Sequence, residues 1–226
     1  GNVYRADRPQ RGRYREFMQC DLDIFGEKTN LGEIELITAI TSFLKKLDFK
    51  GFTIKINDRR ILNALSLSAG FNESDLESVL ISLDKLDKIG FEGVKEELTF
   101  HGYDENCVSH FLGYFKQDLS LEEFCKQFVI EDNIVQNLKE IMDFSTSISE
   151  AKVVFDPTLV RGMGYYTGPI FEIGVDDLNS SIGGGGRYDN MVANYTSMSV
   201  PAVGFSIGFE RLVLLLSERG FKVPSK

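Results

Sequence analysis

The sequence predicts an α+β fold in which a β-sheet flanked by helices is interrupted by an all-helical insertion. Residues 1–26 and 152–211 alternate apolar side chains with polar ones and glycine turns, which is typical of strands. Between about residues 73 and 148 the apolar side chains recur at helical spacing, and no strand pattern interrupts them. We therefore expect residues 1–65 and 149–226 to share one sheet. Residues 66–148 are expected to form a helical insertion between them.

An arginine-rich hairpin opens the chain. Gly12 stands where the chain must turn between its two strands, and five arginines surround this turn: Arg5, Arg8, Arg11, Arg13 and Arg15. Guanidinium groups are planar, always charged and suited to bidentate contacts with phosphate or carboxylate. The hairpin is therefore a candidate anion-binding element. A solvated basic strand end is the other interpretation, since runs of charge usually lie on exposed faces.

The second strand of the hairpin has one unusually polar face. Because side chains alternate with period two, Phe17, Gln19, Asp21 and Asp23 fall on the same side of the strand. Carboxylates are poor core residues, so an apolar core cannot lie against this side. The strand is predicted to line a polar cleft.

Helices follow from apolar spacing and from capping residues. The isoleucines and leucines of residues 31–47 recur at helical spacing, which predicts an amphipathic helix packed on the sheet. Residues 52–57 form a predicted strand, and Asp58 can cap a helix after it. Ser120 and Glu123 match a capping box at the start of another helix. The leucines of residues 212–216 place a helix after the last predicted strand.

Composition excludes several classes of protein. A net charge of −9 argues against nucleic-acid binding over the whole surface, so any RNA contact must be local. The charged run 84–88 is interpreted as a solvent-exposed helix face. Only two histidines could join three unpaired cysteines, so neither a disulfide framework nor a metal site is predicted. No apolar run of membrane-spanning length and no secretory leader occurs, from which we expect a soluble cytoplasmic protein with no membrane partner.

Four segments together resemble one family, the histidyl-tRNA synthetases of class II. Arg5, the loop 8–13 and the strand 16–24 resemble its motif 2, and residues 203–211 resemble motif 3. Residues 159–168 and 183–189 resemble the two boxes of the histidine-specific members. The order of the four matches the family, and it implies a class II synthetase-like antiparallel sheet. A dinucleotide-binding interpretation of the glycines 183–186 fails, because no βαβ unit surrounds them.

The resemblance implies a site for ATP and a catalytic role for two arginines. Arg5 would hold the α-phosphate, Phe17 would stack on adenine, Arg211 would cover the other face of the base, and Arg13 would clamp the terminal phosphates. Arg161 would lie between the amino-acid carboxylate and the α-phosphate, where other class II enzymes place a metal ion. No metal would be held by the protein itself, and Mg²⁺ would arrive with ATP. A salt-bridged arginine at a strand end is the alternative for Arg161.

The resemblance also implies a histidine pocket. Asp23 and Tyr166 would each bind one imidazole nitrogen, Gln19 and Tyr188 would lie near the α-amino group, and Tyr165 and Arg161 would complete the pocket. A pocket for imidazole needs a partner for each nitrogen, since a single partner would admit other flat side chains. The glycines 183–186 would let the backbone approach the substrate and would carry residues 187–189 into the pocket.

The family pattern is incomplete in this chain. The family begins with motif 1, a dimer-forming segment, and ends with an anticodon-binding domain, so we expect a catalytic-core fragment of a protein that forms a homodimer and charges tRNA(His). Gly164 stands where the family commonly has an acid. The regulatory subunit of ATP phosphoribosyltransferase is the alternative, but such paralogues tend to lose the ATP-contacting arginines. Those arginines are present here: Arg5, Arg13, Arg161 and Arg211.

Overall fold

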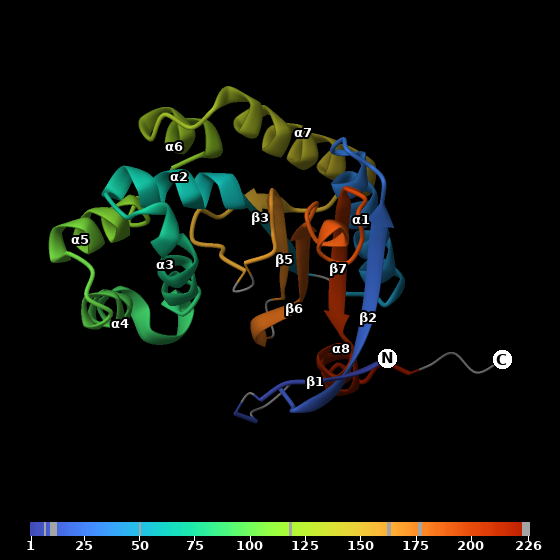
Figure 1. The fold of residues 1–226 in the computed structure, drawn as a ribbon. Helices are drawn as coiled ribbons and strands as arrows, with labels where there is room; N and C mark the ends of the chain where they lie inside the picture. Colours follow the sequence, from blue (N-terminus) through green and yellow to red (C-terminus); the bar gives the residue numbers. More distant parts are fainter. Residues whose placement is uncertain are drawn as a thin grey trace.

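The described residues form one seven-stranded sheet (Figure 1). The computed structural model describes residues 1–6, 8–9, 13–49, 51–117, 119–161, 164–175 and 178–222, with backbone alone for 178–180. The strand order is β1-β2-β7-β6-β5-β3-β4, and every pairing is antiparallel except β3 with β4. The strands are β1 (Asn2–Tyr4), β2 (Glu16–Phe25), β3 (Phe52–Asp58), β4 (Val153–Phe155), β5 (Pro169–Val175), β6 (Leu178–Arg187) and β7 (Ala202–Gly208).

The predicted α+β class is confirmed, and so are the predicted helices around the sheet. Asp58 caps α2 by accepting a hydrogen bond from the backbone N–H of Arg60 at 2.8 Å, and Ser120 and Glu123 form the predicted capping box of α6. Gly12, the predicted turn residue, and Arg11 lie outside the described residues. The helices are α1 (Leu31–Lys46), α2 (Arg59–Ala69), α3 (Leu76–Leu83), α4 (Leu86–Phe100), α5 (Glu105–Tyr114), α6 (Leu121–Gln127), α7 (Asp132–Ser149) and α8 (Phe209–Glu218), with short 3-10 helices η1 (Glu73–Asp75) and η2 (Val192–Asn194).

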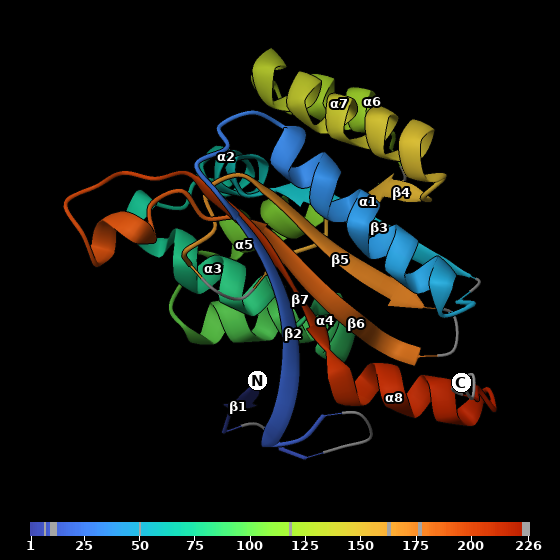
Figure 2. The same ribbon diagram turned by 90° about the vertical axis from the view of Figure 1, so that its right-hand side faces the viewer.

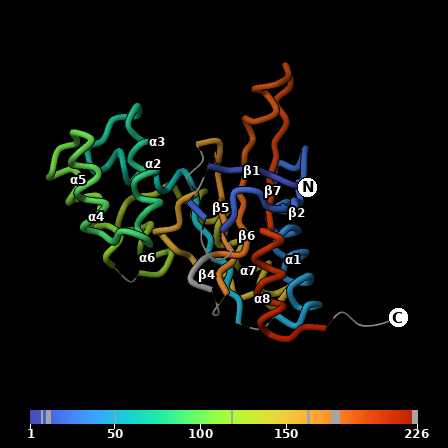
Figure 3. Tube along the Cα trace, turned by 90° about the horizontal axis from the view of Figure 1, so that it is seen from below, coloured from blue at the N-terminus to red at the C-terminus, as the bar shows by residue number. Residues whose placement is uncertain are grey.

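The two faces of the sheet differ in chemistry. One face carries buried apolar side chains that join the core: Ile54, Ile56, Phe171, Ile173, Val203, Phe205 and Ile207. Helix α1 packs on this back face and α7 lies along α1 (Figure 2). The opposite, front face carries the polar side chains of β2 and several glycines. Helices α2 to α5 gather on the other side of the molecule from α1 and α8 (Figure 3).

The helical region is joined to the sheet at both of its ends. Helix α2 follows β3 without a break, and α7 is tied to α1 through Asn30, whose side-chain amide donates to Glu140 at 2.8 Å. One continuous cluster of buried residues includes the helices and the back of the sheet. The boundaries expected at residues 66 and 148 stay a prediction, which native-state hydrogen exchange would test by showing whether α3 to α6 open as a unit. None of the described helices is long and apolar enough to cross a membrane.

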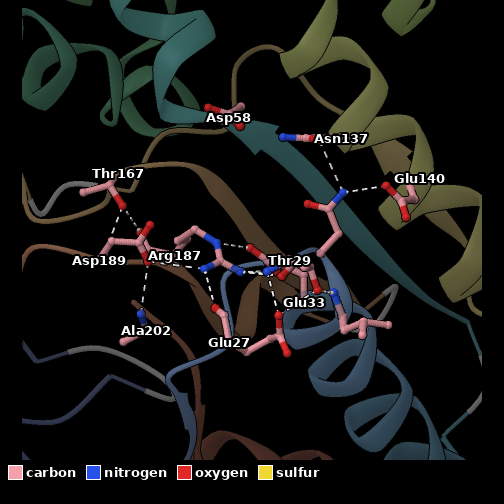
Figure 4. A network of polar contacts seen from close by, with 12 residues as sticks. Glu27, Thr29, Glu33, Asp58, Asn137, Glu140, Thr167, Arg187, Asp189 and Ala202 are labelled. Carbon is pink, nitrogen blue, oxygen red and sulfur yellow. Dashed lines mark hydrogen bonds and ion pairs between the residues drawn. The ribbon is translucent and has the colours of Figure 1, made fainter. Parts of the chain in front are cut away.

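A buried ion pair fastens the back of the sheet to α1 (Figure 4). Arg187, at the end of β6, donates from Nε and Nη2 to the two carboxylate oxygens of Glu33, both at 2.6 Å, and the Glu33 residue is 0% exposed. The same guanidinium donates to the backbone carbonyls of Glu27 and Thr29 and to Asp189 at 3.3 Å. Burial alone would lower the pKa of Arg187, but Glu33 more than reverses this and the pKa is raised.

The expectation that residues 187–189 all enter the pocket is therefore wrong for Arg187. Because side chains alternate along β6, Gly184 and Gly186 belong to the front face and Arg187 belongs to the back. Asp189 also has a structural contact, since its carboxylate accepts a hydrogen bond from the backbone N–H of Ala202 at 3.0 Å. Tyr188 alone of these three turns toward the front.

We predict that Glu33→Gln lowers the free energy of unfolding by about 3–5 kcal/mol, because the buried guanidinium of Arg187 then keeps only the partly exposed carboxylate of Asp189 as a counter-charge. Urea unfolding measures the loss. The control is Lys139→Met, which breaks a pair with Glu122 whose side chains are 49% and 56% exposed, and which should cost less than about 1 kcal/mol. Equal effects of the two substitutions would show that the ion pair with Arg187 does not hold α1 in place.

Candidate active site

The front face is shaped by strand register and by glycines. Gln19, Asp21 and Asp23 of β2 lie opposite Gly208, Ser206 and Gly204 of β7. A Cβ atom at Gly204 would lie within 2 Å of Asp23 Oδ1, so only glycine leaves room for that carboxylate. The polar side predicted for β2 is therefore present, and two of the three β7 residues beside it are glycines, which leave space above the strand.

An acid and three tyrosines meet at one end of this face. The hydroxyl of Tyr188 donates to Asp23 Oδ1 at 2.5 Å, and the hydroxyl of Tyr165 donates to that of Tyr166 at 3.3 Å. The ring of Tyr165 meets the ring of Tyr166 at 4.5 Å between centroids and the ring of Tyr188 at 6.1 Å. The structure thus brings together four side chains that lie up to 165 positions apart in the sequence.

Burial raises the pKa of two of these phenols, Tyr165 and Tyr188. The pKa of Tyr188 is raised by burial and then by its hydrogen bond to Asp23, and the pKa of Tyr165 is raised by burial and then by Tyr166. A neutral phenol can both donate and accept a hydrogen bond. The cluster therefore offers one carboxylate acceptor and several adaptable hydroxyls, a set suited to a flat polar side chain that carries one donor and one acceptor.

Arg161 lies over the middle of the front face. Its Nη1 pairs with Glu172 of β5 at 2.8 Å, and its side chain is 28% exposed. A Cβ atom at Gly184 would lie 2.6 Å from Arg161 Nη1, so the glycine lets the guanidinium rest on β6. Burial would lower the pKa of Arg161, but Tyr166 and Glu172 outweigh it and the pKa is raised. The guanidinium is charged and held close to the tyrosine cluster.

Arginines gather at the other end. The guanidinium of Arg5 lies over the ring of Phe17 at 4.0 Å, and its Nε donates to the backbone carbonyl of Tyr14 at 3.0 Å. Arg211, which follows β7, donates to the backbone carbonyl of Ser181. The pKa of Arg211 is lowered by burial and then by the positive charges of Arg5 and Arg13. This is a concentration of positive charge, which we call the arginine cluster: Arg5, Arg13 and Arg211.

The expected site residues thus fall into three groups along one face. Gln19 and Phe17 share the polar side of β2, near the arginine cluster. Two residues of the first histidine box, Gly162 and Met163, lie outside the described residues. Sequence reasoning missed Glu172 and Glu210. Glu172 follows the period-two pattern of β5, which could have placed it on the front, whereas Glu210 accepts from the backbone N–H of Met18 at 2.7 Å, a contact between segments 192 residues apart that no local pattern shows.

Comparisons with known proteins agree on one family. The sequence profile described as histidyl-tRNA synthetase matches residues 1–212. The histidine--tRNA ligase of Leifsonia xyli subsp. xyli (strain CTCB07) is 46% identical over 225 residues, which cover 95% of this chain and 52% of that protein. The histidine--tRNA ligase of Korarchaeum cryptofilum (strain OPF8) is 38% identical over 217 residues, which cover 94% and 50%. The chain spans about half the length of the curated relatives it matches.

Solved structures share the fold. A histidyl-tRNA synthetase from Nostoc sp. PCC 7120 has a TM-score of 0.81 at 25% identity and covers 99% of this chain and 54% of its own. A protein from Bacillus halodurans C, described as an ATP phosphoribosyltransferase regulatory subunit/histidyl-tRNA synthetase, has a TM-score of 0.76 at 25% identity and covers 96% and 57%. The expected class II synthetase-like sheet is confirmed by these neighbours.

We predict that the folded protein loses stability as the pH rises above about 10, the ordinary pKa of tyrosine. The raised pKa values of Tyr165 and Tyr188 mean that the native state retains protons that the unfolded state releases in this range. Tyr188→Phe should make the decline shallower. Urea unfolding between pH 8 and about 11 measures it, with Tyr195→Phe, at an 86% exposed residue, as the control. If Tyr188→Phe leaves the loss of stability with pH unchanged, the pKa of Tyr188 is not raised in the folded protein.

Proposed function

The chain belongs to the histidyl-tRNA synthetase family, and we propose that it carries the amino-acid-activating site of such an enzyme. The reaction would join histidine to the magnesium complex of ATP, giving histidyl-adenylate and pyrophosphate. A second step would transfer the histidyl group to the 3′ end of tRNA(His). The activity, substrates and partners of the whole protein, including a homodimer and a cytoplasmic location, are part of this proposal.

The order of the three groups along the front face carries the proposal. From Gln19 to Asp23, β2 advances four residues, about 13 Å at about 3.3 Å per residue. The arginine cluster lies toward the Gln19 end, Arg161 lies over the middle, and the tyrosines meet at Asp23. An adenylate has the same order, with a nucleotide, then a phosphoryl junction, then an amino-acid side chain. The site would thus supply cations where the ligand carries phosphate, and a carboxylate with phenol hydroxyls where it carries imidazole.

Arg161 would act at the phosphoryl junction. In the first step a carboxylate oxygen of histidine attacks the α-phosphorus, and the bond to the leaving pyrophosphate breaks. Negative charge then shifts among phosphoryl oxygens beside the amino-acid carboxylate, and a guanidinium held in advance stabilises that charge without having to reorient. Glu172 and Gly184 fix its position, since one pairs with Nη1 and the other leaves room for the side chain.

The tyrosine and acid cluster would select histidine. Asp23 can accept from one imidazole N–H, and the hydroxyl of Tyr166 can pair with the other nitrogen. Tyr188 already donates to Asp23, which orients the carboxylate before substrate arrives. A pocket that leaves buried polar groups unpaired with the wrong substrate discriminates strongly against it. Gln19 and Tyr165 would border the amino-acid backbone.

The arginine cluster would bind the nucleotide. Arg211 and Arg13 would contact the terminal phosphates, and Arg5 would contact the α-phosphate. Phe17 would stack on adenine, with Arg211 on the opposite face of the base. Burial and then the positive charges of Arg5 and Arg13 lower the pKa of Arg211, and a bound polyanion would relieve the repulsion among the three arginines.

A non-catalytic regulatory subunit is the second candidate, because the Bacillus halodurans C neighbour is described partly in those words. The two functions differ in their need for phosphate contacts. A regulatory subunit that does not activate histidine has no use for Arg161 beside a tyrosine pocket or for the arginine cluster. Their presence in one ordered face favours activation.

We predict that Arg161→Ala reduces histidine-dependent ATP–pyrophosphate exchange by roughly a hundredfold or more, the scale of a lost pre-organised electrostatic contact. The loss should appear in kcat, with little change in the KM for ATP, because the arginine cluster still binds the nucleotide. Arg161→Lys should rescue poorly, since an ammonium cannot bridge two oxyanions in a planar fork. Near-parental exchange by Arg161→Ala would make Arg161 structural. Absence of exchange in the parent chain would favour the regulatory subunit.

We also predict that Arg211→Ala weakens ATP binding about tenfold or more, because it removes a charged phosphate contact. Calorimetric titration with ATP and Mg²⁺ measures the affinity. Arg219→Met is the matched control, since it removes an equal charge from a guanidinium that lies over Phe49 at 4.4 Å, outside the front face. The same affinity in the parent and in Arg211→Ala would remove Arg211 from the nucleotide site.

A further inference from the structure

A serine stands between two glycines on the front face of β7. Ser206 lies two residues from Gly204 and two from Gly208, and alternate residues of a strand point to the same side, so all three belong to the front. Strands β2, β7 and β6 lie side by side beneath this face (Figure 2). Ser206 is thus the one of these three positions at which β7 offers a side-chain polar group to a ligand above the sheet.

The strand register places Ser206 in one row with Asp21 and Arg161. Its partner on β2 is Asp21, and its partner on β6 is Gly184. Directly opposed residues have Cβ atoms about 4.5–5.5 Å apart. The guanidinium of Arg161 takes the place of the missing Gly184 side chain, since a Cβ atom there would lie 2.6 Å from Arg161 Nη1. The hydroxyl of Ser206 and the guanidinium of Arg161 are therefore neighbours in this row.

The hydroxyl of Ser206 has no hydrogen-bond partner in the described part of the chain. Its Oγ atom is buried, and burial without a partner costs free energy because the bonds to water have been lost. An alanine would fill nearly the same volume without that cost. A ligand that accepts a hydrogen bond from Ser206 would compensate it. Three other buried hydroxyls share this condition, but they lie behind the sheet in α1 and α7: Thr38, Thr41 and Ser145.

The charges in the row decide which kind of ligand group Ser206 can bind. Asp21, on one side of it, carries a carboxylate that repels an anion. Arg161, on the other side, carries a positive charge that attracts one. An anionic oxygen is therefore favoured above Gly184, between the guanidinium and the hydroxyl. The hydroxyl would donate to such an oxygen, and a hydrogen bond to a charged acceptor is stronger than one between neutral groups.

We propose that Ser206 is a further catalytic residue of histidine activation, whose hydroxyl donates a hydrogen bond to a non-bridging oxygen of the α-phosphate. The inference rests on the proposed function, in which the phosphoryl junction lies over Arg161. Ser206 forms and breaks no covalent bond in this step. While the histidine carboxylate attacks phosphorus and pyrophosphate leaves, its hydroxyl stabilises the phosphoryl oxygens together with Arg161, as a donor fixed in advance by the strand.

The first test is histidine-dependent ATP–pyrophosphate exchange. Ser206→Ala should lower kcat about tenfold or more, with a smaller change in the KM for ATP, because a bond to a charged phosphoryl oxygen is lost. Ser206→Cys should give an intermediate kcat, since a thiol is a weaker donor at the same position. Ser145→Ala is the matched control, because it removes another buried hydroxyl that lacks a described partner, and it should leave exchange unchanged.

The second test separates a role in the reaction from a role in folding. Ser206→Ala and Ser145→Ala should both leave Tm unchanged or raise it, because each removes a buried hydroxyl without a described partner. Ser206→Ala combined with Arg161→Ala should reduce kcat by less than the product of the two single losses, because both residues act on one phosphoryl group.

Three results would overturn the proposal. Exchange by Ser206→Ala within about twofold of the parent would remove the hydroxyl from the reaction. Losses that multiply fully with those of Arg161→Ala would show that the two residues do not act on the same group. Adenosine has no phosphate, so a loss of adenosine affinity as large as the loss in kcat would place the hydroxyl on the nucleoside.

A binding measurement distinguishes failure of this inference from failure of the proposed function. The probe is histidyl sulfamoyl adenosine, a non-hydrolysable adenylate analogue whose sulfonyl oxygens stand in for the phosphoryl oxygens. If the parent shows no exchange, the proposed activation is wrong, and Ser206→Ala should still weaken binding of the analogue about tenfold. Unchanged affinity would overturn the contact with Ser206, and an analogue that the parent does not bind would overturn both.

Discussion

The buried ion pair between Arg187 and Glu33 is the contact on which the remaining arrangement depends. It joins the end of β6 to α1, and its further hydrogen bonds to Glu27 and Thr29 fix the chain that leaves β2 just after Asp23. Neither charge can be left alone in a dry interior, so the pair tolerates only one relative position of strand and helix. These contacts of Arg187 hold the segments that carry Asp23 and Tyr188, and so they position the carboxylate and the hydroxyl.

Glycine serves the two faces of β6 in different ways. On the back, a Cβ atom at Gly185 would collide with the backbone of β7, so glycine permits close strand packing. On the front, Gly184 and Gly186 leave the space that Arg161 and Tyr166 occupy. None of the glycines 183–186 has a positive φ. Glycine is therefore needed there for space and not for an unusual backbone conformation. The site is thus built from side chains of neighbouring segments laid over a bare strand.

Local patterns in the sequence predicted the elements well, because they depend on neighbours in the chain. Asp58 and Ser120 cap helices through bonds that span two or three residues, and the alternation of residues 17–23 needs only one strand. To predict which face of the sheet Arg187 occupies, the register of β6 must be known. A run of glycines carries no side-chain pattern from which that register could be predicted. A cavity beside Arg59 was not predictable, since it arises where α2 meets residues 164–167 and 190–194, and only the folded chain brings these together.

Positive charge in this protein is placed where it costs stability. The chain carries a net charge of −9, and yet Arg5, Arg13 and Arg211 crowd one end of the front face, where burial and mutual repulsion lower the pKa of Arg211. The three guanidiniums come from the hairpin that opens the chain and from the start of α8, so the fold itself brings them together. An anionic ligand best explains this concentration of positive charge, and in the proposed reaction that ligand is the nucleotide.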